Sequence, residues 1–332
     1  MWRSKPRISF KMCLFEKWLV GSKNNCHFFF ILLYFISSLH SSYRKFRKLY
    51  IGWITQGKMK RKKVLFVSQE IMPYLPESNI SKVGRVLPQA IQERGKEIRT
   101  FMPRWGIINE RRNQLHEVIR LSGMNLVIGD TDHPLIIKVA SIQSARMQVY
   151  FIDNEDYFHR KHILTDESGK YFEDNDERAV FFARGVMETV KKLRWAPDII
   201  HCHGWFTSFI PILAKKTYKD DPIFSKAKVV FSVYNDEFDL PLNSSLKNKL
   251  KLENISKKDI EPIKEPNYLN LIKFATHYSD GVIIGEKKIN KSVLEYIKTS
   301  GMTVLPFDDG KDFVAPIDQF YDQIINDNNN DK

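Results

Sequence analysis

The sequence predicts an α/β fold, in which a mostly parallel sheet carries helices on both faces. Apolar runs without alternation, such as 64–68 and 229–233, are typical of strands covered on both faces. Segments with helical spacing of apolar residues, such as 81–94, lie between these runs. Strands that alternate with helices form crossovers between parallel neighbours. We therefore expect a single Rossmann-like layer.

The expected elements follow one another along the chain. Strands are expected at 64–68, 98–102, 115–121, 135–140, 149–152, 199–200, 229–233, 281–284 and 302–305. Helices are expected at 81–94, 175–193, 205–216, 268–277 and 290–298. Gly95 is placed to end the first helix, and Asp174 with Glu177 has the spacing of a capping box at the second. The closely spaced strands before residue 153 predict a hairpin-like excursion, and the lysine-rich span 243–266 predicts irregular backbone.

Three regions differ in composition. Residues 1–58 contain 11 Lys or Arg, one acid and two of the three cysteines. Their apolar run, 28–36, is shorter than the roughly 20 residues that span a bilayer. We expect this basic leader to be an upstream translation, with the native protein starting at Met59; a weak membrane or signal-anchor segment is the alternative. The folded domain is expected at 59–318, and the tail 319–332, which ends in INDNNNDK, is expected to be disordered.

Charge and cysteine content exclude some partners. The leader carries ten of the 13 net positive charges, and the basic and acidic residues of the remaining chain are interspersed. This pattern lacks the basic patch of a nucleic-acid-binding protein. Cys202 is the only cysteine after residue 58, so an intrachain disulfide is not available there, which indicates a reducing compartment, the cytoplasm. A membrane partner is expected only if residues 1–58 belong to the native protein.

Two histidines follow the apolar strand at 199–200. His201 and His203 come at its carboxyl end, and Gly204 allows a tight turn before the next helix. Ligands of open α/β sheets bind beyond the carboxyl ends of the strands, so both rings are well placed for a binding site. Roles as a satisfied turn residue and a capping group are the alternative. Zinc would need further ligands, and none has suggestive spacing, so we expect no metal.

Five stretches in a fixed order resemble the landmarks of bacterial glycogen and starch synthases. They are KKVLFVSQEIMPYL, GRVLPQAIQERGKEIRTFMPRW, DNDERAVFFARGVME, PDIIHCHGWFTS and NYLNLIKFATHYSDGVII. The resemblance covers residues 62 to about 298 and only the amino-terminal lobe of that family. It implies one lobe of a two-lobed GT-B glycosyltransferase, a retaining enzyme that transfers glucose from ADP-glucose to an α-1,4-glucan and needs no cofactor.

The first landmark departs from the family pattern at its centre. Pro76 stands where the family has a lysine, and Ser78 and Asn79 stand where it has paired glycines. A lysine supplies a mobile charge for the donor diphosphate, and glycines allow backbone N–H groups to approach phosphate at a helix start. Proline offers neither charge nor N–H. We expect weakened diphosphate binding here, with Lys82 a surface residue rather than a substitute.

The remaining landmarks supply the candidate site residues. The resemblance implies that His203 and Asp174 are catalytic residues, with His203 in contact with the transferred glucose and Asp174 near the sugar site. It implies substrate binding by seven further residues: Asn175, Arg178, His201, Trp205, Tyr234, Asn235 and Lys273. A helix cap for Asp174 and an exposed helical position for Lys273 remain alternatives. Three acids that follow Asn235, namely Asp236, Glu237 and Asp239, are expected to be solvated.

The resemblance thus implies a glycogen or starch synthase-like protein with incomplete machinery. The family's second lobe supplies most of the ADP-glucose site, and only a few dozen residues follow the last expected strand. We expect activity to be impaired, or to depend on a separate protein that supplies a second lobe. The expected ligands are ADP-glucose and an α-glucan. A non-catalytic module that binds glucan or a partner protein is the alternative.

Overall fold

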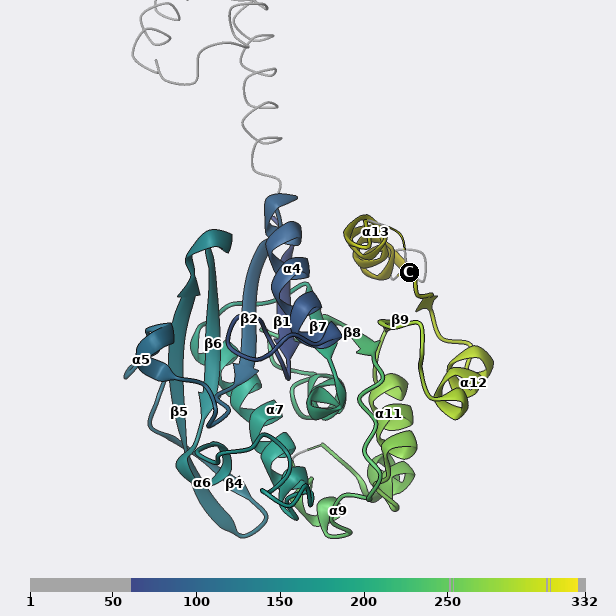
Figure 1. Ribbon diagram of the computed structural model, residues 1–332. Coiled ribbons are helices and arrows are strands. Elements are labelled where there is room, and N and C mark those ends of the chain that lie inside the picture. Colours follow the sequence, from purple (N-terminus) through teal and green to yellow (C-terminus); the bar gives the residue numbers. More distant parts are fainter. Residues whose placement is uncertain (1–60, 251, 253, 309, 311, 328–332) are drawn as a thin grey trace, which may run out of the picture. The chain divides into compact units, whose positions relative to one another are not determined.

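A ten-stranded sheet forms the centre of the described part of the chain (Figure 1). The computed structural model describes residues 61–327 except 251, 253, 309 and 311; the expected leader 1–58 and the end of the tail, 328–332, lie outside them. The strands are β1 Lys63–Ser68, β2 Glu97–Pro103, β3 His116–Glu117, β4 Met124–Ile128, β5 Thr131–Ile142, β6 Met147–Asp153, β7 Ile199–His203, β8 Lys228–Val233, β9 Gly281–Ile284 and β10 Val304–Leu305.

The strand order is β10-β9-β8-β7-β1-β2-β6-β5-β3, with β4 paired to β5. All pairs from β10 to β6 are parallel, and the pairs of β5 with β6, β3 and β4 are antiparallel. The mostly parallel Rossmann-like layer and its hairpin-like excursion are therefore confirmed. The excursion's first strand is shorter than the expected 115–121, because only His116 and Glu117 pair with β5.

Helices follow the strands as expected from the crossover pattern. They are α4 Asn79–Glu93, α5 Glu110–Asn113, α6 Glu155–Phe158, α7 Asn175–Lys192, α8 Ile210–Ile212, α9 Leu246–Lys249, α10 Lys257–Ile260, α11 Tyr268–His277, α12 Lys291–Thr299 and α13 Val314–Asn326. Short 3₁₀ turns are η1 Gln143–Ala145, η2 Trp205–Thr207 and η4 Glu261–Ile263, and η3 Leu213–Thr217 is a π turn. Within the described residues, no helix combines the length and apolar character that a bilayer crossing requires.

Alternation of side chains along β1 divides the core between the two faces of the sheet. Val64 and Phe66 join a cluster that includes residues of α4 and α13. Leu65 and Val67 join the larger cluster, to which α7 and α11 contribute. The sheet is thus covered on both faces, which explains why its central strands are apolar without alternation.

Two expected elements differ in detail. The helix expected at 205–216 is broken into η2, α8 and η3. Pro211 lacks the N–H that a continuous helix from Trp205 would need at that position. The span 243–266 is more ordered than expected, because it holds α9, α10 and η4. Lys249 of α9 anchors it through ion pairs to Asp176 at 2.6 Å and Glu177 at 2.8 Å.

The prediction of a disordered tail from residue 319 is wrong for its first part. Helix α13 runs to Asn326 and buries Ile317, Phe320, Tyr321 and Ile324. These residues have helical spacing and pack in the cluster that includes β1, β8 and β9. The prediction of disorder followed the asparagine-rich end of the chain and overlooked the helical spacing of these apolar residues.

Truncation of the α13 stripe tests its place in the core. We expect Ile324→Ala, at a side chain that is 2% exposed, to lower the free energy of unfolding by about 2–5 kcal/mol, because the cavity it leaves cannot fully collapse. Ile119→Ala is the matched control, since Ile119 is 83% exposed; it should change stability by less than about 0.5 kcal/mol. Urea unfolding measures both. Equal losses for the two variants would contradict this packing.

Candidate functional site

The two histidines of β7 lie at the centre of a buried hydrogen-bond network. His201 is 0% exposed and His203 is 1% exposed. Nδ1 of His201 lies 2.6 Å from the Tyr321 hydroxyl of α13, and Nε2 lies 2.7 Å from the Ser232 hydroxyl of β8. The two imidazole rings approach to 3.9 Å between centroids. His201 therefore links α13 to β8 through its two ring nitrogens.

His203 has one protein partner and one unpaired nitrogen. Nδ1 lies 2.8 Å from the hydroxyl of Tyr234, and Nε2 has no hydrogen-bond partner among the described residues. Burial lowers the pKa of His203 to about 3 and that of His201 well below its usual value, and burial raises the pKa of the Tyr234 phenol. All three groups are therefore neutral near pH 7. They can hydrogen-bond a ligand, but they cannot attract it by charge.

Tyr234 depends on a close approach of the backbone after β9. A Cβ atom at Gly285 would lie 2.5 Å from Cε1 of the Tyr234 ring, so a larger residue would displace the ring. In the resemblance, Tyr234 stands where the family commonly has a histidine. The structure shows that the phenol at this position contacts His203 directly.

Asp236 is a half-buried acceptor, and the prediction that it is solvated is wrong. It accepts hydrogen bonds from the Trp205 backbone N–H at 2.7 Å and from the Tyr268 hydroxyl at 2.9 Å. Tyr268 also donates to the carbonyl of Tyr234, which joins this group to the histidines. Burial raises the pKa of Asp236 to about 6. Glu237 and Asp239 are exposed, as expected.

The hydrogen bond between the Trp205 N–H and Asp236 has one signal in the sequence, at Gly204. The turn that begins at Trp205 follows a glycine at φ +84°, which has no side chain with which to cap the free N–H groups. A capping acceptor therefore had to come from elsewhere in the chain. Nothing local indicated that Asp236 supplies it.

Asp174, Asn175 and Arg178 form a second group at the start of α7. Arg178 is fully buried and donates to the Tyr157 carbonyl at 2.7 Å and to Oδ1 of Asn175 at 2.6 Å. Its guanidinium lies 5.1 Å from the Trp105 ring, and burial lowers its pKa to about 9. These contacts hold the loop before α7 in place.

The capping box predicted at α7 is absent, because the Asp174 side chain makes no cap hydrogen bond. It forms instead a bidentate ion pair with Arg160, at 2.8 and 2.5 Å. Asp174 is therefore a charged group at the edge of the loop. Trp105 lies between the histidine network and the group at the start of α7. Its ring centroid is 4.9 Å from that of Phe206, and its ring also contacts Arg178.

Lys273 lies apart from both groups. It is on α11, and its ammonium lies 5.2 Å from the Tyr296 ring of α12. This cation–π contact joins two helices on one side of the sheet. Lys273 is not among the residues that line the cleft described next.

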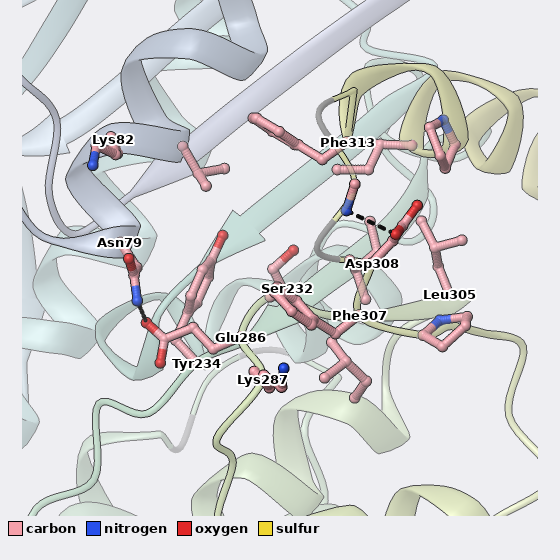
Figure 2. A pocket seen from close by; sticks show the side chains of 18 of the residues that line it. Asn79, Lys82, Ser232, Tyr234, Glu286, Lys287, Leu305, Phe307, Asp308 and Phe313 are labelled. Atoms are coloured by element: carbon pink, nitrogen blue, oxygen red, sulfur yellow. Dashed lines mark hydrogen bonds between the residues drawn. The ribbon is translucent and has the colours of Figure 1, made fainter.

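A cleft of ≈ 880 Å³ opens at the carboxyl ends of β8, β9 and β10 (Figure 2). Ser232, Tyr234 and Asn235 form part of its wall, and the first residues of α4 face them. Phe307 and Phe313, on the segment that leads into α13, supply aromatic surface. Of the predicted site residues, the exposed Asn235 and the largely buried Tyr234 line this cleft.

The start of α4 is closed by its own side chains. The Ser78 hydroxyl accepts from the Ser81 N–H at 3.0 Å and donates to the carboxylate of Glu70. Asn79 donates to Glu286 at 2.6 Å, a bond drawn in Figure 2. Lys82 pairs with Glu77 at 2.5 Å and its side chain is 57% exposed, which confirms that it is a surface residue.

One cluster has the composition of a metal site. Glu110, Asp153 and His159 offer ligand atoms within 4.8 Å of one another. The Lys138 ammonium lies 2.7 Å from Glu110 and 2.9 Å from Asp153, and Arg104 also pairs with Glu110. Two protein cations already neutralise the carboxylates, so the geometry is that of an ion-pair network.

The mostly parallel sheet flanked by helices matches one lobe of a GT-B glycosyltransferase. The chain belongs to the starch synthase catalytic domain family, because the family model of that description matches residues 63–304. The resemblance seen in the sequence is therefore confirmed.

This chain matches only part of the length of its individual relatives. The glycogen synthases of Chlorobium limicola and Chlorobaculum tepidum are 41% and 42% identical over 174 residues, which are 52% of this chain and 36% of each relative. The chain thus aligns with about a third of the length of these curated relatives. The catalytic domain of starch synthase IV from Arabidopsis thaliana, solved with ADP and acarbose, has a TM-score of 0.62 at 18% identity, over 76% of this chain and 52% of that one. This likeness shows the shared fold.

The half-buried Asp236 carboxyl predicts a specific pH dependence of stability. Its folded pKa, about 6, exceeds the unfolded value of 3.8, so the folded state binds more protons between these values. Stability from this group is therefore fully present below about pH 4 and is lost as the pH rises through 6. We expect Asp236→Asn, which keeps an acceptor without the charge, to gain about 1–3 kcal/mol relative to the wild type from pH 4 to pH 7.

Urea unfolding at several pH values measures this difference. Glu237→Gln is the matched control, because Glu237 is the exposed neighbouring acid and should show the same pH profile as the wild type. Parallel profiles for Asp236→Asn and the wild type would show that the Asp236 carboxyl is not destabilised by folding.

Proposed function

We propose that this chain is the acceptor-side lobe of an ADP-glucose-dependent α-glucan synthase. Glucosyl transfer then depends on a second lobe, carried by another protein or by a further part of a longer chain. The observation that supports this most is the neutral pair of His203 and Tyr234 at the carboxyl ends of β7 and β8. Neutral donors and acceptors suit sugar hydroxyl groups, and ligands of open α/β sheets bind at this edge.

In this proposal, Nε2 of His203, a buried nitrogen without a hydrogen-bond partner among the described residues, hydrogen-bonds a hydroxyl of the transferred glucose. Asp174, held by Arg160, contacts the same sugar from the loop before α7. Tyr234 and Asn235 bind the ligand in the cleft that they line. His201, Trp205, Asn175 and Arg178 act as positioning residues through the buried contacts described above, and Lys273 is assigned a structural contact.

The chemistry left to the second lobe is stabilisation of the leaving diphosphate. Preorganised cations usually supply the largest part of such stabilisation. The start of α4 offers none, since Pro76 replaces the family's lysine and Lys82 is paired with Glu77. Residues of this lobe would bind and orient the glucan and exclude water from it.

We propose a cytoplasmic location, consistent with the unpaired, buried thiol of Cys202.

A non-catalytic glucan-binding module is the second candidate. The carboxylates of Glu70 and Glu286 at the start of α4 favour it, because they stand where a donor phosphate would need positive charge. The two candidates share glucan binding and differ in turnover.

Transfer of label from radiolabelled ADP-glucose to glycogen separates the candidates. We expect no transfer by the purified protein alone, and transfer when it is added to an extract of source cells that lack its gene. His203→Asn should reduce that transfer by about 10²-fold, the range observed when one positioned hydrogen-bond donor is removed. Lys226→Ala, at an exposed position that does not line the cleft, is the control and should leave it unchanged.

Absence of transfer in every extract would reject a second lobe supplied by a separate protein, and absence of transfer by a longer chain that contains this lobe would reject the synthase proposal. Affinity electrophoresis in glycogen-containing gels then tests the second candidate. Retarded mobility that His203→Asn abolishes would support a glucan-binding module, and unchanged mobility of the wild type would reject that candidate too.

A further inference from the structure

Gln69, the residue that follows β1, joins the two groups of the candidate site, and the proposed function leaves it without a role. It is 5% exposed. Its backbone N–H donates to the carbonyl of His203 at 3.3 Å, which extends the pairing of β1 with β7 by one residue. Its own carbonyl accepts from the indole N–H of Trp105 at 2.8 Å. Because Trp105 also contacts Arg178, the main chain of Gln69 connects the histidine network to the start of α7.

The side chain of Gln69 caps the turn η2, which follows β7. The first N–H groups of a helical turn have no acceptor within the turn itself. Oε1 of Gln69 accepts from the Phe206 N–H at 3.2 Å, and Asp236 accepts from the Trp205 N–H at 2.7 Å. Two side chains from beyond the ends of other strands thus supply the acceptors that Gly204, which has no side chain, does not offer.

The amide group of Gln69 also accounts for the glycine at position 204. A Cβ atom at Gly204 would lie 2.5 Å from both Cδ and Oε1 of Gln69, closer than van der Waals contact allows. A larger residue would have to displace this amide and, with it, the hydrogen bond to the Phe206 N–H. The positive φ of Gly204 is a separate constraint on the same position. Positions 69 and 204 are therefore sterically complementary.

We propose that Gln69 is a positioning residue, which fixes His203 relative to the group at the start of α7. It acts through the His203 carbonyl and through the turn η2, and it needs no contact with a ligand. Misplacement of a reacting group by about 1 Å can lower a rate by about 10²-fold, so such a residue can control turnover. The effect on turnover rests on the proposed function; the effect on the position of His203 does not.

Gln69→Met tests the side-chain contact, because methionine keeps the length of glutamine and lacks its amide oxygen. We expect amide hydrogen exchange at Phe206 to become about tenfold faster or more, because this N–H loses its acceptor. The ¹⁵N resonances of the His203 ring should move. Those of His201 should stay in place, because its ring is held by α13 and β8.

Gln92→Met is the matched control, since Gln92 is an exposed glutamine on α4. It should change neither the exchange at Phe206 nor the resonances of His203. Ring resonances of His203 that stay in place in Gln69→Met would overturn the positioning role, whatever the exchange at Phe206. An equal movement of these resonances in Gln92→Met would overturn it too.

Gly204→Ala, made in the wild type and in Gln69→Ala, tests the steric complementarity. The strain of an alanine at positive φ is the same in both backgrounds and cancels in the comparison. We expect Gly204→Ala to lower the urea midpoint of the wild type more than that of Gln69→Ala, because the second background has lost the amide that a Cβ would meet. Equal losses, or a double variant that folds no better than Gly204→Ala alone, would contradict the complementarity.

Transfer of label from ADP-glucose to glycogen separates failure of this role from failure of the proposed function. In the assay described above, Gln69→Met should lower transfer by about tenfold or more, and Gln92→Met should leave it unchanged. Full transfer by Gln69→Met would overturn its control of turnover. If the wild type transfers no label, the proposed function fails in that assay, and the ring resonances of His203 alone decide whether Gln69 positions it.

Discussion

Burial of two neutral imidazoles at the end of β7 is the constraint on which the rest of the site depends. A buried polar ring must find hydrogen-bond partners, because an unpaired one loses its solvation without compensation. His201 finds them in Tyr321 and Ser232, and so fixes α13 against the sheet. His203 finds one in Tyr234, and so fixes the wall of the cleft. The helix that covers the sheet and the surface that faces a ligand are thus joined through adjacent rings.

The charge distribution around this network separates two functions that a synthase must combine. Neutral hydrogen-bonding groups gather at β7 and β8, and carboxylates gather at the start of α4. The first arrangement suits a sugar, and the second opposes a diphosphate. Pro76 stands where the family has a lysine, and the Glu286 carboxylate accepts from Asn79, the first residue of α4.

The sequence predicted the sheet well because apolar runs and helical spacing are local signals. The helix 268–277 and the strand 281–284 were predicted with the bounds that the structure has. Long-range contacts had no such signal. Asp236 is buried by Trp205 and Tyr268, about thirty residues away on either side, and an acid in a polar loop resembles a solvated one. The tail was wrongly predicted to be disordered because its asparagine-rich composition is typical of disorder, although Phe320 and Ile324 have helical spacing.

The ring nitrogens of the histidines give the most direct test that this neutral pair is a sugar site. Long-range ¹H–¹⁵N correlation spectra, recorded from pH 5 to 8 with and without maltoheptaose, report the protonation and contacts of each nitrogen. The account predicts that both rings stay neutral throughout and that maltoheptaose shifts Nε2 of His203 while the nitrogens of His201 stay unchanged. Titration of either ring near pH 6.5, or saturation with maltoheptaose without a shift at His203, would contradict it.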